Sequence, residues 1–346
     1  MDLLKLEKIL EDQPAYRADQ AREAVLKSLA EDWTQVVGLP KEIRERLAKE
    51  CPLEINAKVF SSEGGDSMKA VITFSDGLKA ETVLMRHRDA SPDGESRRKG
   101  VRNTICVSSQ VGCPMACSFC ATGKMGFKRN LQWFEIVEQV VFFARILKKE
   151  GERVTNIVFM GMGEPFMNYD NVLTAVRVMN DPKGLGIGAR HISISTAGVV
   201  EGIEKLIDEP LQVNLALSLH APNDVLRTTL MPVNIKYPID TVFAALLRYV
   251  KNANRRVMFE YIMIDGVNDS DECARELAAL IKGRLSLKLA FINLIRYNPT
   301  GVFKPSPQVR VDAFKKILED EHIEVTERYR FGRQIKAACG QLASKE

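Results

Sequence analysis

Hydrophobic residues recur along this chain with two alternating spacings, which predict a regular succession of strands and helices. Between residues 104 and 320, short runs of apolar residues are each followed by a longer stretch with an apolar residue every three to four positions. The six predicted strands are Thr104–Ser109, Asn156–Met160, His191–Ser195, Val213–Leu219, Arg256–Met263 and Leu287–Ile295. The six predicted helices are Gln132–Lys149, Asn171–Asn180, Val200–Ile207, Ile239–Lys251, Ser270–Lys282 and Gln308–Asp320. Successive strand–helix units of this kind are typical of parallel strands joined by right-handed crossovers.

The predicted strands are apolar along nearly their whole length, as expected of parallel strands covered on both faces. An open doubly wound sheet and a curved partial barrel both fit this pattern, whereas a complete eight-stranded barrel needs two more units than the chain supplies. In either architecture the carboxyl ends of the strands share one edge. Polar or glycine-rich loops follow all six strands, among them "GMGEP" at 161–165 and "SLHAPND" at 218–224. A single ligand site is therefore predicted at that edge.

The first 88 residues follow a different pattern. Three helical segments, separated by Pro14 and Pro40, precede three short predicted strands joined by turns rich in Gly, Ser and Asp. This pattern predicts a small helical and β accessory domain over residues 1–88. A basic loop over 89–103, the α/β unit over 104–300 and a C-terminal segment over 301–346 would complete the chain.

Composition excludes several classes of protein. The 346 residues are 45% hydrophobic and 27% charged, and no run of about 18 apolar residues is present, so no membrane span is expected. The charged first residues do not form a secretory signal, and we expect a cytoplasmic monomer. In a reducing compartment, seven cysteines indicate metal or catalytic roles rather than a disulfide framework.

Cys113, Cys117 and Cys120 form a C-x3-C-x2-C pattern directly after the first predicted strand. A structural zinc site takes four protein ligands, so zinc would require Cys106 or a distant cysteine as well. An iron–sulfur cluster held by three thiolates would keep one iron open to another ligand. Three buried thiols that lie together by chance are the remaining alternative.

This pattern, with the aromatic Phe119 before the last cysteine, resembles the radical S-adenosylmethionine enzymes. The resemblance implies a partial (βα)6 TIM-like barrel and one [4Fe–4S] cluster on the three cysteines. In that family the open iron chelates S-adenosylmethionine, which is cleaved to a 5′-deoxyadenosyl radical by an electron from an external donor. "GMGEP" resembles the loop that meets the cofactor's amino group, which implies contacts from Gly163 and Glu164. Further cofactor contacts are implied for Ser195, Ser218, Leu219, His220 and Asn298.

Four longer motifs are more specific. They are "ICVSSQVGCPMACSFCATG" from Ile105, "SLHAPND" from Ser218, "IRYNP" from Ile295 and "AACGQL" from Ala337. Together they resemble the RNA adenine methyltransferases of this superfamily. The resemblance implies methylation of adenosine carbon 2 in 23S ribosomal RNA, at the peptidyl transferase centre, and in the anticodon loop of tRNA. Two S-adenosylmethionine molecules would be used per turnover.

The same resemblance implies three catalytic residues. Cys339 would carry a methyl group as S-methylcysteine and join the RNA covalently. Cys106 would release the product by forming a transient disulfide with Cys339, which an external reductant must reset. Glu81 would remove the proton from carbon 2. The basic side chains of Arg330, Arg333 and Lys336 would favour the Cys339 thiolate.

Basic residues on both sides of the cysteine loop are expected to contact RNA phosphates. They are Arg86, Arg88, Arg97, Arg98, Lys99, Arg102, Lys128 and Arg129. Methylation at carbon 8, which confers antibiotic resistance, is the nearest alternative, although Pro165 and "HAPND" resemble the carbon-2 branch. A non-catalytic metal-containing RNA-binding protein and a radical enzyme with a protein substrate are the alternatives from other classes.

Overall fold

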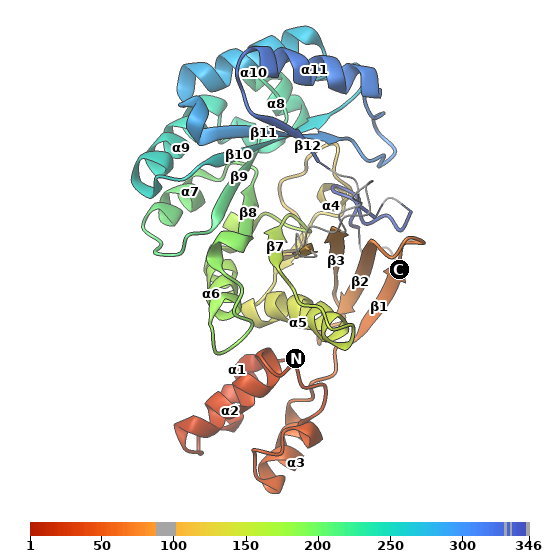
Figure 1. Cartoon of the computed structure of the whole chain (residues 1–346), viewed down its shortest axis with the longest axis vertical. Coiled ribbons are helices and arrows are strands. Elements are labelled where there is room, and N and C mark those ends of the chain that lie inside the picture. Colours follow the sequence, from red (N-terminus) through yellow and green to blue (C-terminus); the bar gives the residue numbers. More distant parts are fainter. Residues whose placement is uncertain (88–101, 329–330, 333, 344–346) are drawn as a thin grey trace, which may run out of the picture.

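The computed structural model describes residues 1–87, 102–328, 331–332 and 334–343 (Figure 1). Within these residues, no helix is long and apolar enough to cross a membrane. Most of the predicted basic loop over 89–103 lies outside the described residues, as do Arg330 and Arg333.

Ten strands form one continuous mixed sheet around which the molecule is built. Its strands are β1 (Ala57–Ser61), β2 (Ser67–Thr73), β3 (Lys79–His87), β4 (Arg102–Cys106), β7 (Asn156–Phe159), β8 (Ile192–Thr196), β9 (Asn214–Ser218), β10 (Val257–Met263), β11 (Ala290–Arg296) and β12 (Val325–Glu327), in that spatial order. From β4 to β12 all neighbours are parallel. Because the strands follow one another in chain order without a reversal, the doubly wound alternative is excluded, and the α/β partial barrel is confirmed.

Helices cover the outer face of the parallel strands, as Figure 1 shows. They are α5 (Trp133–Lys149), α6 (Tyr169–Asn180), α7 (Val200–Ile207), α9 (Ile239–Ala253), α10 (Asp271–Arg284) and α11 (Gln308–Asp320), whereas the short α8 (Asp224–Leu230) lies between β9 and α9 and contacts the cysteine loop. The six predicted helices agree with these bounds to within two residues. Local sequence explains some of the starts. A capping box of Gln132 and Glu135 begins α5, and the Ser270 side chain caps α10. The short α8 and the seventh parallel strand, β12, were not predicted.

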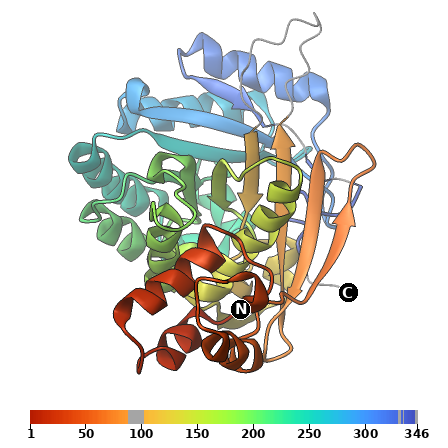
Figure 2. The ribbon, with the colours of Figure 1, turned by 60° about the horizontal axis from the view of Figure 1, so that its bottom comes forward.

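The N-terminal strands extend the barrel sheet. β1, β2 and β3 are antiparallel, and β3 pairs with β4 so that Val83 lies opposite Cys106. The helices α1 (Leu3–Ile9), α2 (Ala15–Leu26) and α3 (Lys41–Glu50) form a group of their own on the α5 side of the barrel (Figures 1 and 2). Arg145 of α5 joins the two parts by donating hydrogen bonds to the Leu53 and Ala30 carbonyls. The division into domains at residue 88 stays a prediction.

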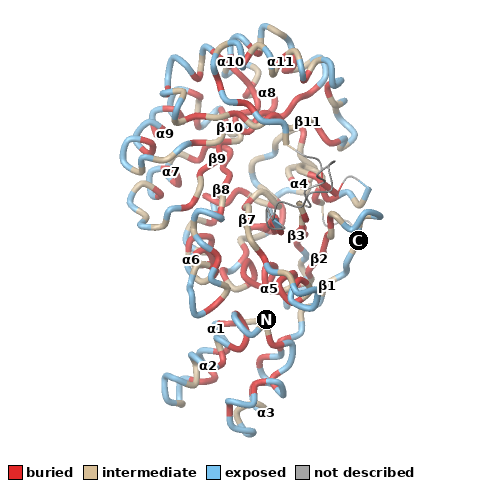
Figure 3. Tube along the Cα trace, viewed as in Figure 1, coloured by how far each residue is buried: buried red, intermediate tan, exposed pale blue. Residues whose placement is uncertain are grey.

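Burial follows the strands and the inward faces of the helices, as Figure 3 shows in red. Side chains such as Phe159, Ile194 and Phe259 on the parallel strands are almost fully buried. Burial of this kind on the strands fixes the barrel, so that the loops at the carboxyl ends of the strands are held against a rigid base.

Candidate functional site

The three predicted metal ligands lie on a loop held at both ends by a small hairpin. The hairpin consists of β5 (Gln110–Gly112) and β6 (Phe127–Asn130), which pair antiparallel before and after the cysteines. Gly112 has a φ of +76°, and a side chain there would collide with the Gly126 carbonyl oxygen. A glycine is therefore required for the hairpin to close.

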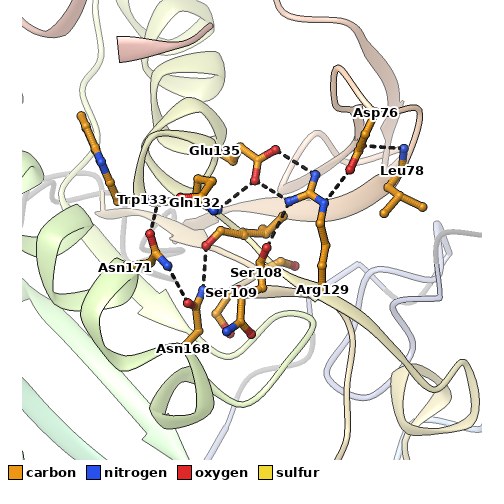
Figure 4. A network of polar contacts seen from close by, with 12 residues as sticks. Asp76, Leu78, Ser108, Ser109, Arg129, Gln132, Trp133, Glu135, Asn168 and Asn171 are labelled. Atoms are coloured by element: carbon orange, nitrogen blue, oxygen red, sulfur yellow. Dashed lines mark hydrogen bonds and ion pairs between the residues drawn. The ribbon is translucent and has the colours of Figure 1, made fainter. Parts of the chain in front are cut away.

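A polar network, drawn in Figure 4, braces this hairpin against the barrel. The Arg129 guanidinium pairs with Asp76 at 2.6 Å and with Glu135 at 2.7 Å. Asn168 donates to the carbonyls of Ser109 and Leu131, at 2.8 Å and 2.7 Å. The network joins the turn before β3, the hairpin, α5 and the start of α6.

Two hydrogen bonds to backbone carbonyls fasten the cysteine loop to the C-terminal segment. The Ala121 amide donates to the Gly340 carbonyl at 2.8 Å, and the Thr122 hydroxyl donates to the Leu342 carbonyl at 2.6 Å. Cys339 is thereby held beside the loop, although more than two hundred residues separate them in the chain.

A cavity of about 160 Å³, called here the central cavity, opens between the strand ends and this loop. Nine residues predicted for the site line it: Cys113, Cys117, Cys120, Gly163, Glu164, Ser195, Ser218, His220 and Cys339. Also on its wall are Glu260 and Arg328, which the sequence did not point to.

Gly163 and Glu164 form a tightly packed turn after β7. Gly163 has a φ of +98°, and a Cβ atom there would lie 2.6 Å from Cβ of Gln110. The Glu164 carboxylate accepts hydrogen bonds from the amides of Phe166 at 3.1 Å and Ala197 at 2.7 Å. Burial raises its pKa to about 7, against the effect of these donors. The Thr196 side chain donates to the carboxylate as well, and the carboxylate keeps lone-pair capacity for a further donor, such as an ammonium group.

Ser195 and Ser218 face each other at the ends of β8 and β9, with their hydroxyl oxygens 3.3 Å apart. His220 has a left-handed backbone with φ of +60°. Burial lowers its pKa to about 3, and its Nδ1 atom accepts from the Ile262 amide at 3.1 Å. The ring is therefore neutral and carries its proton on Nε2. Leu219, which was also expected to contact the cofactor, is buried and does not line the central cavity.

Cys106, Cys339 and Asn298 line a smaller adjoining cavity, called here the side cavity. Both cavities share Met160, Ile295, Arg328, Cys339 and Leu342 on their walls, so they are continuous. The Asn298 amide donates to the Cys339 carbonyl at 3.2 Å. Burial raises the pKa of the Cys106 thiol to about 12, and the nearby Cys339 adds to this effect. Both cysteines are free thiols in this structure.

Among the residues that the structure describes, Arg328 is a cation that lines both cavities with Cys339. Its Nη1 atom lies 3.6 Å from Oε1 of Glu260 and 3.0 Å from the Met160 sulfur. Burial alone would lower the pKa of Arg328, but the acidic groups around it, Cys339 first, raise the pKa overall. Arg330, Arg333 and Lys336 were expected beside the Cys339 thiol, and Lys336 lines neither cavity. Arg330 and Arg333 lie outside the described residues, and Arg328 was missed because no motif marks it.

Glu81 is buried on β3 and lines neither cavity. Since Val83 pairs with Cys106 and side chains alternate along a strand, Glu81 lies on the same face of the sheet as Cys106. Its Oε1 atom lies 3.6 Å from the Lys69 ammonium. Its part in catalysis stays a prediction.

Two arginines expected to contact RNA are engaged within the protein instead. Arg86 is buried and pairs with Glu150, and Arg129 belongs to the network in Figure 4. Glu150 lies 64 residues from Arg86 and Asp76 lies 53 residues from Arg129, so the basic pattern alone could not reveal these two pairs. Lys128 is exposed beside the cysteine loop.

The three cysteines suit a cluster better than a single ion. Within the described ranges, no three His, Cys, Asp or Glu side chains are placed to hold one metal ion together. A four-iron cluster spaces its thiolates further apart, because each binds a different iron. Burial raises the pKa of Cys113 to about 12 and that of Cys117 well above its ordinary value. The positive charge of bound iron would reverse this effect, since a coordinating thiol is deprotonated.

Arg227 of α8 organises the loops beneath the cysteines. It is fully buried and donates to the carbonyls of Leu219 at 3.2 Å and Ala197 at 2.6 Å. The last residue of the same helix, Leu230, accepts a hydrogen bond from the Ser118 amide at 3.0 Å. One buried cation therefore connects the loops after β8 and β9 to the helix that supports the cysteine loop.

Comparisons with known proteins agree with this geometry. Residues 107–278 match the Radical SAM superfamily. The chain is 43% identical to the "Ribosomal RNA large subunit methyltransferase N" of Nitrosopumilus maritimus, over 98% of this chain and 95% of the relative. It is 42% identical to a "Probable dual-specificity RNA methyltransferase RlmN" of Dictyoglomus thermophilum, over 95% and 91%.

A solved structure covers the whole chain. The crystal structure of a radical SAM methyltransferase from Sphaerobacter thermophilus matches with a TM-score of 0.91 and 44% identity, over 100% of this chain and 98% of the other. Near-complete coverage at this identity, with the cysteine loop and the strand-end loops around one cavity, leads to a single assignment. The chain belongs to the RlmN family of radical S-adenosylmethionine RNA methyltransferases.

Proposed function

We propose that this enzyme methylates carbon 2 of adenosine in 23S ribosomal RNA, at the peptidyl transferase centre, and in the anticodon loop of tRNA. The observation that carries the proposal is the position of Cys339. Its side chain lines the central cavity with Cys113, Cys117 and Cys120, and it lines the side cavity with Cys106. Carbon 2 of adenine is electron-poor, so a methyl group has to be activated on the enzyme before it can be added there.

The residues present fit the group that the family implies. Cys113, Cys117 and Cys120 would hold a [4Fe–4S] cluster, and Gly163 and Glu164 would meet the methionine end of S-adenosylmethionine. Gly163 lines the central cavity in a turn that only glycine allows, and Glu164 keeps acceptor capacity for an ammonium. When bound, the cluster and two cofactor molecules supply the methyl group and the radical that activates it.

Cys339 would take the methyl group as a thiolate and carry it to the adenine. Arg328 supports this role by position, because its side chain and that of Cys339 line the same two cavities. Since Cys339 is tied to the cysteine loop through Gly340 and Leu342, methyl acceptor and cofactor site share one rigid frame.

Cys106 would resolve the covalent bond between Cys339 and the RNA. Both thiols line the side cavity, and Cys339 contributes to the raised pKa of Cys106. Attack by Cys106 on the Cys339 sulfur would release the methylated base and form a disulfide, which an external reductant resets. Glu81 would take the proton from carbon 2. Its support is the shared sheet face with Cys106.

Nucleoside analysis tests this function. Protein with an anaerobically reconstituted cluster would be incubated with a 23S rRNA fragment or tRNA, S-adenosylmethionine and a reductant, and digested RNA compared with methyladenosine standards by mass spectrometry. We expect 2-methyladenosine from wild type and from the matched control Cys273→Ala, whose cysteine lies on α10 outside both cavities. Cys339→Ala should give none. Product at carbon 8, or product from Cys339→Ala, would contradict the proposal.

A further inference from the structure

A row of polar side chains crosses the inner face of the barrel along the wall of the central cavity. Ser195 on β8 contacts Ser218 on β9, Ser218 is the register partner of Glu260 on β10, and Glu260 is that of Asn293 on β11. Parallel strands otherwise bury apolar residues here. A polar row on a buried wall therefore requires a polar partner.

Glu260 is the one acid in this row, and one of its two carboxylate oxygens interacts with neighbouring side chains. Its side chain is almost completely buried. Oε1 accepts a hydrogen bond from the Asn293 amide at 3.2 Å and faces the Arg328 guanidinium at 3.6 Å. Two donors from neighbouring elements thus fix the orientation of the carboxylate.

The second carboxylate oxygen, Oε2, can accept a hydrogen bond from a ligand. Oε2 is buried and has no hydrogen-bond partner among the residues that the structure describes, while the side chain lines the central cavity. Leaving a buried charged acceptor unsatisfied is costly, so such an atom on a cavity wall points to a ligand that donates hydrogen bonds. Nothing in the roles proposed above uses this atom.

We propose that Oε2 of Glu260 binds the ribose hydroxyl groups of S-adenosylmethionine. The inference rests on the proposed function, which places the methionine end of the cofactor at the cysteine loop and Glu164. From there the nucleoside must extend across the strand ends, and Ser195, Ser218 and Glu260 follow in that order. A carboxylate that accepts from ribose hydroxyls is a recurring solution for nucleotide cofactors. The target adenine would instead approach from the Cys339 side.

The test uses protein with a reconstituted cluster under conditions in which it does not turn over. Its affinity for S-adenosylmethionine and for the 2′-deoxy and 3′-deoxy analogues is measured by anaerobic equilibrium dialysis. Glu260→Gln keeps the shape but replaces one acceptor by a donor. We expect it to weaken cofactor binding about tenfold or more, the range of a hydrogen bond to a charged group. Wild type should bind at least one deoxy analogue more weakly than S-adenosylmethionine, by a similar factor. Glu260→Gln should bind that analogue about as weakly as wild type does, because the contact is already missing.

The controls separate this inference from the function on which it rests. Glu319→Gln, on the exposed face of α11, is the matched substitution and should bind the cofactor as wild type does. If wild type itself fails to bind S-adenosylmethionine, the proposed function is wrong.

Two results would overturn the ribose contact alone. One is unchanged cofactor affinity in Glu260→Gln, with or without a loss of RNA affinity. The other is a wild type that binds both deoxy analogues as tightly as S-adenosylmethionine. The wild-type comparison needs no substitution, so it decides the matter even where the variant folds poorly.

Discussion

Replacing Gly163 by alanine tests whether the turn after β7 is built for close approach. Two costs add at this position. A Cβ atom would lie 2.6 Å from Cβ and 2.8 Å from the backbone nitrogen of Gln110, and the backbone φ is +98°. Overpacking costs about 1–3 kcal/mol, and a left-handed backbone costs an alanine about 1–2 kcal/mol. We therefore expect a loss of about 3 kcal/mol in the free energy of unfolding.

The substitution should also reach the cofactor site through Gln110. Its side-chain carbonyl accepts from the Glu164 amide at 2.9 Å, and its amide donates to Asn130 at 2.8 Å. Displacing Gln110 moves the backbone that presents the Glu164 carboxylate. Affinity for S-adenosylmethionine should fall together with stability, since both depend on the same contact.

Two other glycines separate the causes. Gly186 has a φ of +62° but open space around it, and Gly64 has open space and no positive φ. By differential scanning fluorimetry, at roughly 2 °C per kcal/mol for a chain of this size, Gly163→Ala should lower Tm by about 6 °C. Gly186→Ala should lower it by about 2–4 °C and Gly64→Ala hardly at all. A Gly163→Ala protein with wild-type Tm and cofactor affinity would refute the reasoning.

The buried His220 side chain should make the stability of the protein depend on pH. Burial lowers its pKa from 6.5 to about 3, so below pH 6.5 the unfolded state binds more protons than the folded state. The free energy of unfolding should therefore decrease as the pH is lowered, by about 2 kcal/mol between pH 6.5 and 5. His220→Asn, which tolerates a positive φ, should remove this slope in urea titrations, and an unchanged slope would refute it. Arg129→Met should lower the free energy of unfolding by about 2–3 kcal/mol in the same titrations, because the nearly buried Glu135 loses its cation. A loss below about 0.5 kcal/mol would contradict the stabilising role of the network in Figure 4. Cys117→Ser should abolish four-iron reconstitution in iron and sulfide analysis, with Cys273→Ser retaining it. Cys106→Ala should accumulate a covalent protein–RNA species on denaturing gels, and its absence would argue against the resolving role.

Strand ends were the part of the site that sequence could predict. Cys113, Gly163, Ser195 and Ser218 each follow an apolar run, and parallel strands bring such positions to one edge whatever the details of packing. The position of Cys339 and its C-terminal segment beside the cysteine loop was expected only from the resemblance to the RNA adenine methyltransferases. Its physical basis is a pair of hydrogen bonds to residues 121 and 122, which no periodicity reveals.

The residues that were missed owe their roles to tertiary contacts. Glu260 sits in an apolar strand, where one acid carries no pattern, and Arg328 follows a three-residue strand that was itself not predicted. Conversely, Arg86 and Arg129 were expected to contact RNA because they lie in basic stretches, whereas their partners Glu150 and Asp76 lie 64 and 53 residues away. Charge clusters show where cations are, but only packing shows which of them remain available.

The central claim is that three thiolates leave one iron open for a cofactor which the loops after β7, β8 and β9 hold in place. Its most direct test is the release of 5′-deoxyadenosine from S-adenosylmethionine by chemically reduced, anaerobically reconstituted protein, followed by liquid chromatography. We expect release by wild type and none by Cys117→Ser. A four-iron protein that binds the cofactor yet releases no 5′-deoxyadenosine on reduction would contradict it.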